Sequence, residues 1–559
     1  MNILDKNWLE YLLLILAFLE GLIFINMVAG RHFARFDLTQ EHRYSISHPT
    51  KQMLQGLDDN IYIEVYLDGD LPAGFKRMRK SLLETLDEFR IYSNNKVQFK
   101  SINPELATSA KSRSQLMKRL ASKGLPPTDV FMIENGKKIQ KRILPGVVVV
   151  YGSRELGVQL FKGNQSAPAN ERINQSIEGM EYELANTIHS ITQSQLPVIS
   201  LARGNDELKG NDFSSLLHTL QDQFRVKTVN LKDRAIGTTD LLLVAQPKSK
   251  FSELEKYRLD QYIIRGGAVI FLIDKLSVSM DSAATGTYSF PYDLNLDDLL
   301  FHYGVRINND LVQDFVSGAY PIVVGNAGDR PNIQLLQWPF FPIINDFSSH
   351  VIVKNLDALR TEFVSSIDTV KAEGIRKEVL FTTSNYARRS TAPVHVDINS
   401  MKDKLDPKRF QVHHIPIACL LEGRFSSFFK NRFLPDGADT TSFKTTGMPA
   451  KLLVVGDGDI ARNLKDPKTG APLPLGYDPY LRQMFSNQDF ILNSLNYLIQ
   501  GEGLIKARAK EVKIRPLDKV KIQNNRRIIQ FINLALPVLG LLMFGLVFHL
   551  IRKFRYSKF

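Results

Sequence analysis

The chain has 559 residues, which at about 150 residues per domain predicts two to four domains. With 44% hydrophobic and 23% charged residues, overall disorder is excluded. Lys and Arg (71) outnumber Asp and Glu (58), and the one cysteine, Cys419, excludes an intramolecular disulfide framework, a CxxC redox pair and a cysteine-based zinc site. A mean hydropathy of −0.14 excludes a chain with many membrane spans but allows one or two.

The first apolar stretch runs from Tyr11 to Val28 and just reaches the length needed to cross a hydrocarbon core of about 30 Å. Met27 stands where a signal peptidase needs a small residue, so we predict an uncleaved anchor rather than a cleaved signal peptide. Glu20 lies near the middle of the stretch and Asn26 near its end. Because a carboxylate is costly in lipid, Glu20 is expected to face a protein partner.

A second apolar stretch, from Ile528 to Ile551, is long enough to span a membrane with some tilt, and a buried core helix is the alternative. Gln530 and Asn533 lie three residues apart, on one face and near its beginning. Like Asn26, they either contact a partner helix or lie at headgroup level.

The tail after the second stretch is basic and contains no acidic residue, so the positive-inside rule places the C-terminus in the cytoplasm. Arg526 and Arg527 on the other flank point the opposite way, but long loops translocate largely regardless of charge. Two spans then place both termini in the cytoplasm of a bacterium, the protein in its inner membrane, and the large central region in the periplasm. Nucleic acid is not an expected partner there.

The predicted organisation is an α/β protein flanked by two transmembrane helices. Its parts are an N-terminal transmembrane anchor (1–30), a juxtamembrane connector (31–52), a thioredoxin-like α/β domain (53–165), a linking helix (166–194), a flavodoxin-like, glutamine-amidotransferase-like α/β domain with insertions (195–505), a connector (506–527), a C-terminal transmembrane helix (528–551) and a cytoplasmic tail (552–559).

The first domain begins with a β-α-β pattern. Alternating residues at 61–67 and 97–102 predict strands, and an apolar stripe from Phe75 to Phe89 predicts the helix between them. A polar helix near 108–122 is followed by strands at 129–133, 138–143 and 147–151, with hairpin turns at Asn135-Gly136 and Gly152-Ser153. An amphipathic helix at 170–193 leads into the next domain.

The second domain reads as a doubly wound parallel sheet, because short, continuously apolar strands alternate with helices. Strands are predicted at 197–201, 226–231, 241–245, 268–273 and 451–455, and helices at 213–224, after the Ser252-x-x-Glu255 capping box, and at 490–499. Between them, 279–289 and 316–332 are expected to be surface excursions, and further strands are predicted at 351–353, 363–367, 379–383 and 415–421.

Doubly wound sheets bind ligands beyond the carboxyl ends of their strands. The loop after the first strand contains Arg203, Gly204, Asn205 and Glu207, whose cation and backbone N–H groups could hold an anion. An ordinary capped loop is the simpler reading.

Other constellations give no catalytic site. The chain has neither a G-x-G-x-x-G after a strand nor a Walker A run, which argues against a dinucleotide enzyme or an ATPase. Cys419 lies in an apolar strand, where a thiol is expected to be buried and inert. Asp457 and Asp459 end one strand and could hold a hard cation, although a polar loop at the rim is the favoured reading. No cofactor and no metal are expected.

Several segments in chain order resemble the gliding-motility-associated ABC transporter substrate-binding family, GldG, among the auxiliary ABC transport components. They are RFDLTQEHRYSIS at 35–47, EVYLDGDLPAGF at 64–75, RGGAVIFLID at 265–274, LLEGRFSSFF at 420–429 and FILNSLNYLIQGEGLIKAR at 490–508. The resemblance implies an accessory subunit with a large periplasmic part and, as partners, an ABC permease subunit and its ATPase.

The expectation is therefore a non-enzymatic periplasmic module held by two membrane helices. A binding module for cell-wall glycan or a secreted polypeptide is one alternative, and it would need an exposed aromatic groove, for which Trp338-Pro339-Phe340-Phe341 is the densest run. A hydrolase or amidotransferase on the flavodoxin-like domain is the other.

Overall fold

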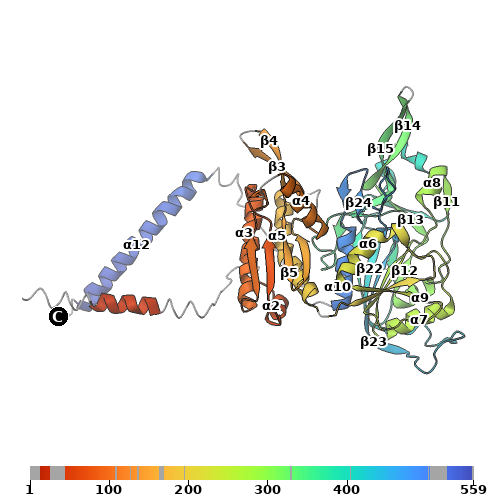
Figure 1. The fold of residues 1–559 in the computed structure, drawn as a ribbon, viewed down its shortest axis with the longest axis horizontal. Coiled ribbons are helices and arrows are strands. Elements are labelled where there is room, and N and C mark those ends of the chain that lie inside the picture. The colour runs from red at the N-terminus through yellow and green to blue at the C-terminus, as the bar shows by residue number, and fades with distance from the viewer. Residues whose placement is uncertain are drawn as a thin grey trace, which may run out of the picture. The chain divides into compact units, whose positions relative to one another are not determined.

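The computed structural model describes residues 13–24, 45–106, 110–125, 127–134, 137–162, 169–193, 195–327, 330–402, 405–500, 503 and 525–556. It is a mixed α/β protein (Figure 1). The turn predicted at Asn135-Gly136, most of both predicted connectors, Asn26 and the last three residues lie outside the described residues.

The N-terminal part follows the predicted β-α-β pattern. Its elements are α2 (His48–Gln55), β1 (Ile61–Val65), α3 (Ala73–Tyr92), β2 (Val97–Ser101), η1 (Pro104–Leu106), α4 (Ala110–Ser122), β3 (Thr128–Glu134), β4 (Lys137–Ile143), β5 (Gly146–Tyr151), β6 (Arg154–Gln159) and α5 (Ala169–Thr192). The sheet order is β2-β1-β5-β6, with β1 and β2 parallel and the other pairs antiparallel. One core cluster contains Leu82 and Leu86 of α3 together with Leu184 and Ile188 of α5, so α5 completes this core as well as leading onward.

An eight-stranded sheet organises the second part, in the order β16-β19-β22-β23-β10-β9-β7-β8. Its strands are β7 (Val198–Arg203), β8 (Arg225–Asn230), β9 (Leu241–Ala245), β10 (Ala268–Leu272), β16 (Asp346–Phe347), β19 (Ile375–Thr382), β22 (Pro416–Ser426) and β23 (Thr446–Val455). The pairs from β8 to β23 are parallel, and β22, β19 and β16 extend the sheet antiparallel. The return of 451–455 to this sheet is thereby confirmed.

Helices cover both faces of this sheet, as its continuously apolar strands require. Residues of α6 (Ser214–Gln223) and α10 (Asn487–Gln500) share one core cluster with Leu243 and Ile270. Residues of α7 (Glu253–Ile264) and α9 (Asp297–Tyr303) share the other cluster with Leu242 and Val269. The predicted capping box opens α7, because Ser252 Oγ accepts from the N–H of Glu255 and Glu255 Oε2 accepts from the N–H of Ser252.

Shorter elements build the rest of this part. They are η2 (Gly210–Asp212), α8 (Met280–Thr285), β11 (Thr287–Ser289), β12 (Val305–Ile307), β13 (Asp310–Asp314), β14 (Ser317–Ala327), β15 (Arg330–Ile344), β17 (Leu359–Arg360), β18 (Ile367–Thr369), β20 (Ala387–Thr391), β21 (Val394–Val396), η3 (Ile398–Lys402), η4 (Pro407–Arg409), η5 (Asp459–Ala461), β24 (Tyr477–Asp478) and β25 (Gln483–Met484).

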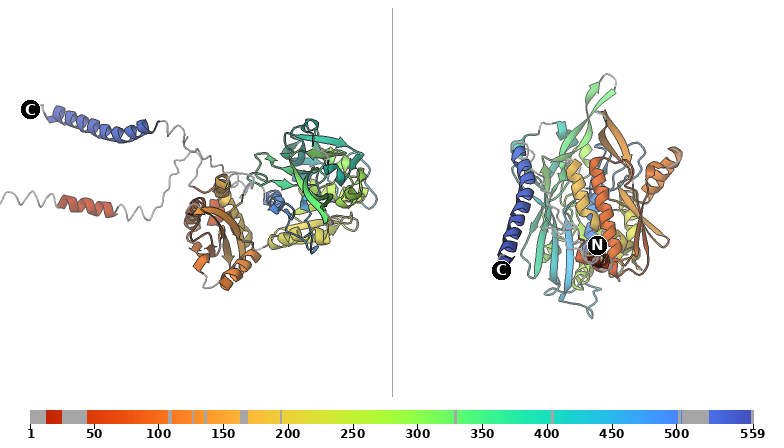
Figure 2. Two further views of the ribbon diagram at one scale, coloured as in Figure 1. Left: turned by 90° about the horizontal axis from the view of Figure 1, so that it is seen from above. Right: turned by 90° about the vertical axis from the view of Figure 1, so that its left-hand side faces the viewer.

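The segment 316–332 is a surface excursion, as predicted, because β14 and β15 form a long antiparallel hairpin that projects from the body (Figures 1 and 2). Two other predictions in this region are wrong. Residues 351–353 form a turn rather than a strand. Ile352 and Val353 are apolar because their side chains pack in the core, not because they pair with a neighbouring strand. The strand predicted at 363–367 begins only at Ile367, since Phe363 has a φ of +50° that breaks the extended run.

The C-terminal helix α12 (Arg526–Tyr556) forms a separate unit. Its residues Arg526–Arg555 are long and apolar enough to cross a membrane, and none of its candidate window is buried. It contains Pro537, which membrane helices tolerate. Of the predicted first span, the structure describes an apolar helix over Leu13–Phe24, which is shorter than a crossing requires, and the rest of that span lies outside the described residues.

Candidate functional site

A cluster of buried carboxyl groups lies at the carboxyl edge of the parallel strands. Asp274 follows β10, and Asp457 and Asp459 follow β23, which pairs with β10 in parallel. One carboxylate oxygen from each lies within 4.8 Å of the others, and no more than 9% of any of the three residues is exposed. The parallel pairing thus brings together acids that are far apart in the chain.

Hydrogen-bond donors of the chain itself fill this cluster. Gln246, directly after β9, donates through Nε2 to Asp274 Oδ2 (2.5 Å) and to Asp459 Oδ1 (2.6 Å). The backbone N–H of Gly458 donates to Asp274, and the N–H of Asp459 donates to Asp457 Oδ1 at 2.7 Å. The Arg462 guanidinium forms an ion pair with Asp459.

Burial controls the ionisation of these acids. Desolvation raises the pKa of Asp274, and desolvation together with repulsion from Asp459 and Asp274 raises the pKa of Asp457 well above its usual value. Burial also raises the pKa of Asp459 to about 8, although Arg462 opposes the shift. At neutral pH the cluster therefore holds protons, because three carboxylates this close cannot all ionise.

The residue types match those that bind a hard cation, but their surroundings do not. At the place where such an ion would lie, the amide N–H of Gln246 points between the oxygens of Asp274 and Asp459. Asp457 and Asp459 lie in a polar loop at the sheet edge, as the favoured reading had it, but both are buried there. The network instead fixes the loops at this edge of the sheet.

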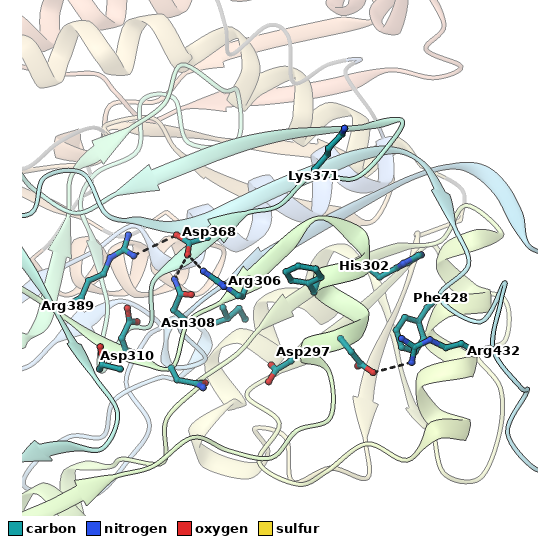
Figure 3. A pocket seen from close by; sticks show the side chains of 15 residues that line it. Asp297, His302, Arg306, Asn308, Asp310, Asp368, Lys371, Arg389, Phe428 and Arg432 are labelled. Atoms are coloured by element: carbon teal, nitrogen blue, oxygen red, sulfur yellow. Dashed lines mark hydrogen bonds and ion pairs between the residues drawn. The ribbon is translucent and has the colours of Figure 1, made fainter.

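An open pocket of about 960 Å³ is the second candidate site (Figure 3). One wall is built around Asp368 of β18, which Arg306 Nη2 and Asn308 Nδ2 contact at 2.7 and 2.9 Å. Arg389 Nη1 lies 3.7 Å from the same carboxylate. Burial opposes ionisation of Asp368, but these hydrogen bonds outweigh it and hold its pKa below the usual value.

The other wall comes from α9 and from the segment after β22. Arg432 lies over the ring of Phe428, with 3.7 Å between guanidinium and ring centroid, and its Nη1 lies 3.7 Å from Asp298. Phe301 of α9 lines the pocket and is 50% exposed. Lys371 stands above both walls in Figure 3. The pocket therefore combines charged side chains with an accessible aromatic ring.

The predicted loop after β7 lies beside the sheet edge, and its capacity to hold an anion stays a prediction. Arg203 is half-buried, and burial lowers its pKa. Gly204 has a φ of +118°. The N–H of Asn205 donates to Glu207 Oε2 at 3.0 Å, so it is directed at a carboxylate of the chain. Asn205 Oδ1 and Glu207 Oε1 have no hydrogen-bond partner among the described residues, and acceptors of this kind disfavour an anion.

The structure also describes Cys419, the aromatic run at 338–341 and Glu20. Cys419 is buried in β22, which confirms the predicted burial, and burial raises the pKa of its thiol to about 12. Trp338, Phe340 and Phe341 are buried in a core cluster, so they form no exposed aromatic groove. Glu20 is exposed on its short helix.

The polar positions of the second span also lie on the surface. Gln530 and Asn533 are exposed on α12. Whether Gln530 and Asn533 contact a partner helix or lie at headgroup level stays a prediction.

Sequence reasoning missed Asp274 as a member of the acidic cluster and missed the pocket entirely. The signal for Asp274 was present, since it ends a buried strand as Asp457 does. One wall of the pocket, in contrast, comes from short strands whose antiparallel pairing no periodicity predicts.

Comparison with known proteins gives a family and a distant relative. Residues 196–494 match the family described as an ABC-type uncharacterized transport system, and residues 40–150 match a domain of unknown function. An uncharacterized protein of Borreliella burgdorferi is 21% identical over 547 residues, which cover 94% of each chain.

Solved structures show weaker likeness. The mmIFT52 N-terminal domain has 16% identity and a TM-score of 0.31, covering 55% of this chain and 98% of that one. A ThuA-like protein from Parabacteroides merdae has 12% identity and a TM-score of 0.26, covering 58% of this chain and 94% of that one.

Proposed function

We propose that this chain, which belongs to the ABC-type uncharacterized transport system family, is a non-enzymatic, membrane-anchored subunit that assembles with a separate ABC permease and its ATPase. The family match over 196–494 carries the proposal, because it covers more than half of the chain, including the eight-stranded sheet. A link to gliding motility and membership of GldG are part of the proposal and rest on the sequence segments that resemble that family.

The membrane helix supports the anchoring. α12 exposes nearly all of its apolar side chains. Exposing them to water would cost free energy, whereas exposing them to lipid is favourable. The basic C-terminal end of α12 supports a cytoplasmic C-terminus. In the proposed topology the chain has two spans, so that both termini are cytoplasmic and the α/β body lies in the periplasm.

The sheet orders support the finer fold assignment. In β2-β1-β5-β6, a parallel β-α-β unit is followed by two antiparallel strands, as the thioredoxin-like layout requires. In β8-β7-β9-β10-β23, the parallel strands follow the order 2-1-3-4-5 of flavodoxin-like sheets.

The chemistry of the sheet edge supports a non-enzymatic role. Where a doubly wound sheet places its ligand, Gln246 and Arg462 are bonded to the chain's own acids. The single thiol, on Cys419, is buried and protonated rather than poised for attack.

Recovery of partner chains tests the proposal. The tagged full chain, purified from membranes in mild detergent, should bring with it a permease and an ATPase, identified by mass spectrometry. Glu20→Leu should insert at least as well and recover less permease, because a mid-span carboxylate that faces protein loses its hydrogen bond. Glu20→Gln, which keeps a hydrogen-bonding group, is the matched control and should recover more permease than Glu20→Leu. Equal recovery by all three at equal expression would remove Glu20 from the interface, and recovery of neither partner would overturn the proposal.

The pocket favours a second candidate, a periplasmic binding module for a cell-wall glycan or a secreted polypeptide. Its volume of about 960 Å³ lies within the range of ligand sites. The third candidate is a hydrolase on the flavodoxin-like domain, which would require a nucleophile. Loss of all function in a Cys419→Ala variant that still folds and inserts into the membrane would support it.

A further inference from the structure

The carboxylates of the pocket each have a partner within the protein. Asp297 is held by Lys275 Nζ at 2.6 and 2.8 Å, and Asp298 by Lys256 Nζ at 2.8 Å. Asp310 accepts from the N–H and the hydroxyl of Ser366 at 2.9 and 2.6 Å. Asp368 is held by Arg306, as described above. Three of these acids are thus paired with a cation of the chain, and Asp310 is buried, so they attract a cationic ligand only weakly.

The cations of the pocket retain free donors. Lys371 is exposed, and no ion pair or hydrogen bond holds its ammonium group within the part of the chain that the structure describes. Arg389 and Arg432 have side chains that are 35% and 53% exposed, and each has a single carboxylate contact at 3.7 Å, which is too long for a hydrogen bond. Because a guanidinium carries five N–H donors, most of theirs remain available.

These three cations are spread over the pocket rather than gathered at one point. In Figure 3, Arg389 and Arg432 lie at opposite sides of the pocket, and Lys371 lies above both. A single small anion therefore cannot contact all three. The planar face of Arg432 rests on Phe428, which leaves its N–H edge free to bind a carboxylate in the bidentate geometry.

We propose that this pocket binds an extended acidic polypeptide segment, whose carboxylates reach Lys371, Arg389 and Arg432. The half-exposed ring of Phe301 offers the apolar contact that a peptide can use and a phosphate cannot. Asn309 and Thr391, both exposed on the lining, can hydrogen-bond a peptide backbone. This assignment does not depend on assembly with a transporter, because the pocket lies within one chain.

Direct binding tests the assignment. Purified full chain in detergent is titrated at low salt with hexaglutamate, hexalysine, inorganic phosphate and oligogalacturonate. We expect hexaglutamate to bind more tightly than the other three. Lys371→Gln and Arg432→Gln should each weaken hexaglutamate binding about fivefold, the scale of one exposed ion pair, and about 20-fold together, since they are separate sites. Lys227→Gln, which removes an exposed lysine of β8 outside the pocket, should leave the affinity unchanged.

Several results would overturn the assignment. They are a failure of hexaglutamate to bind, equal affinity for inorganic phosphate, tighter binding of oligogalacturonate, or an equal loss in Lys227→Gln. Unchanged melting temperatures of the two pocket variants confirm that they fold, so that a loss of affinity reports on the pocket itself.

Discussion

Replacing Asp459 with asparagine should make the protein increasingly more stable than wild type as the pH rises. Asp459 is 9% exposed, and burial raises its pKa to about 8 although Arg462 opposes the shift. Asparagine has nearly the same shape, keeps an acceptor for Gln246 and cannot ionise. In wild type, folding must keep the Asp459 carboxyl protonated at a pH at which the unfolded chain ionises it, and this lowers the free energy of unfolding. The substitution removes that loss.

The sign and size follow from proton linkage. Unfolded Asp459 loses its proton near pH 3.8, whereas the folded group holds it to about pH 8. Between these values the folded state binds more protons, so the free energy of unfolding of wild type falls as pH rises. About three pH units separate 3.8 from 7, which corresponds to about 4 kcal/mol at pH 7 if Asp459 titrates alone, and to less where Asp274 and Asp457 share the proton.

Thermal unfolding of the full chain in detergent, from about pH 4.5 to about pH 8.5, measures this difference. Asp466→Asn is the matched control, because backbone N–H groups of Lys468 and Thr469 lower the pKa of Asp466 instead of raising it. Because Asp466 is ionised in both states throughout this range, the difference between wild type and Asp466→Asn should not change with pH. If wild type instead gained stability relative to Asp459→Asn with rising pH, Asp459 would be ionised against Arg462 and the reasoning would be refuted.

Other variants test the core, the sheet edge and the orientation. Cys419→Ala should retain function at a cost of about 1–2 kcal/mol, measured by thermal unfolding, and the wild-type thiol should resist alkylation in the folded protein because its pKa is about 12. Trp338→Ala should cost about 3–5 kcal/mol in the same assay, because Trp338 is fully buried with Phe341 at 4.9 Å and Phe363 at 5.5 Å between ring centroids. Chelator, or added Mg²⁺ or Ca²⁺, should leave the melting temperature unchanged, since Gln246 already fills the acidic cluster; stabilisation that Asp274→Asn abolished would contradict this. A reporter active only in the cytoplasm should be active when fused after Phe559, and activity of a periplasmic reporter instead would reverse the orientation.

Much of the fold could be predicted because its signals are local. The run LLLVA at 241–245 is apolar on both faces, and only a strand covered by helices on both sides buries it completely. The capping box at Ser252 and Glu255 fixes the start of α7 within four residues of sequence. α12 was evident for the same reason, since a membrane span needs only length and composition.

The candidate site depended on the tertiary structure. Asp274 and Asp459 both accept hydrogen bonds from Gln246 only because β9, β10 and β23 are adjacent in the sheet. The sequence of a single strand does not determine which strands lie beside it. The same holds for the pocket, where antiparallel pairing of β12 with β18 and of β13 with β20 brings Arg306 and Arg389 to Asp368. Periodicity determines which face of an element is buried, whereas the neighbours across that face determine which charges remain free, and those neighbours are set by long-range packing.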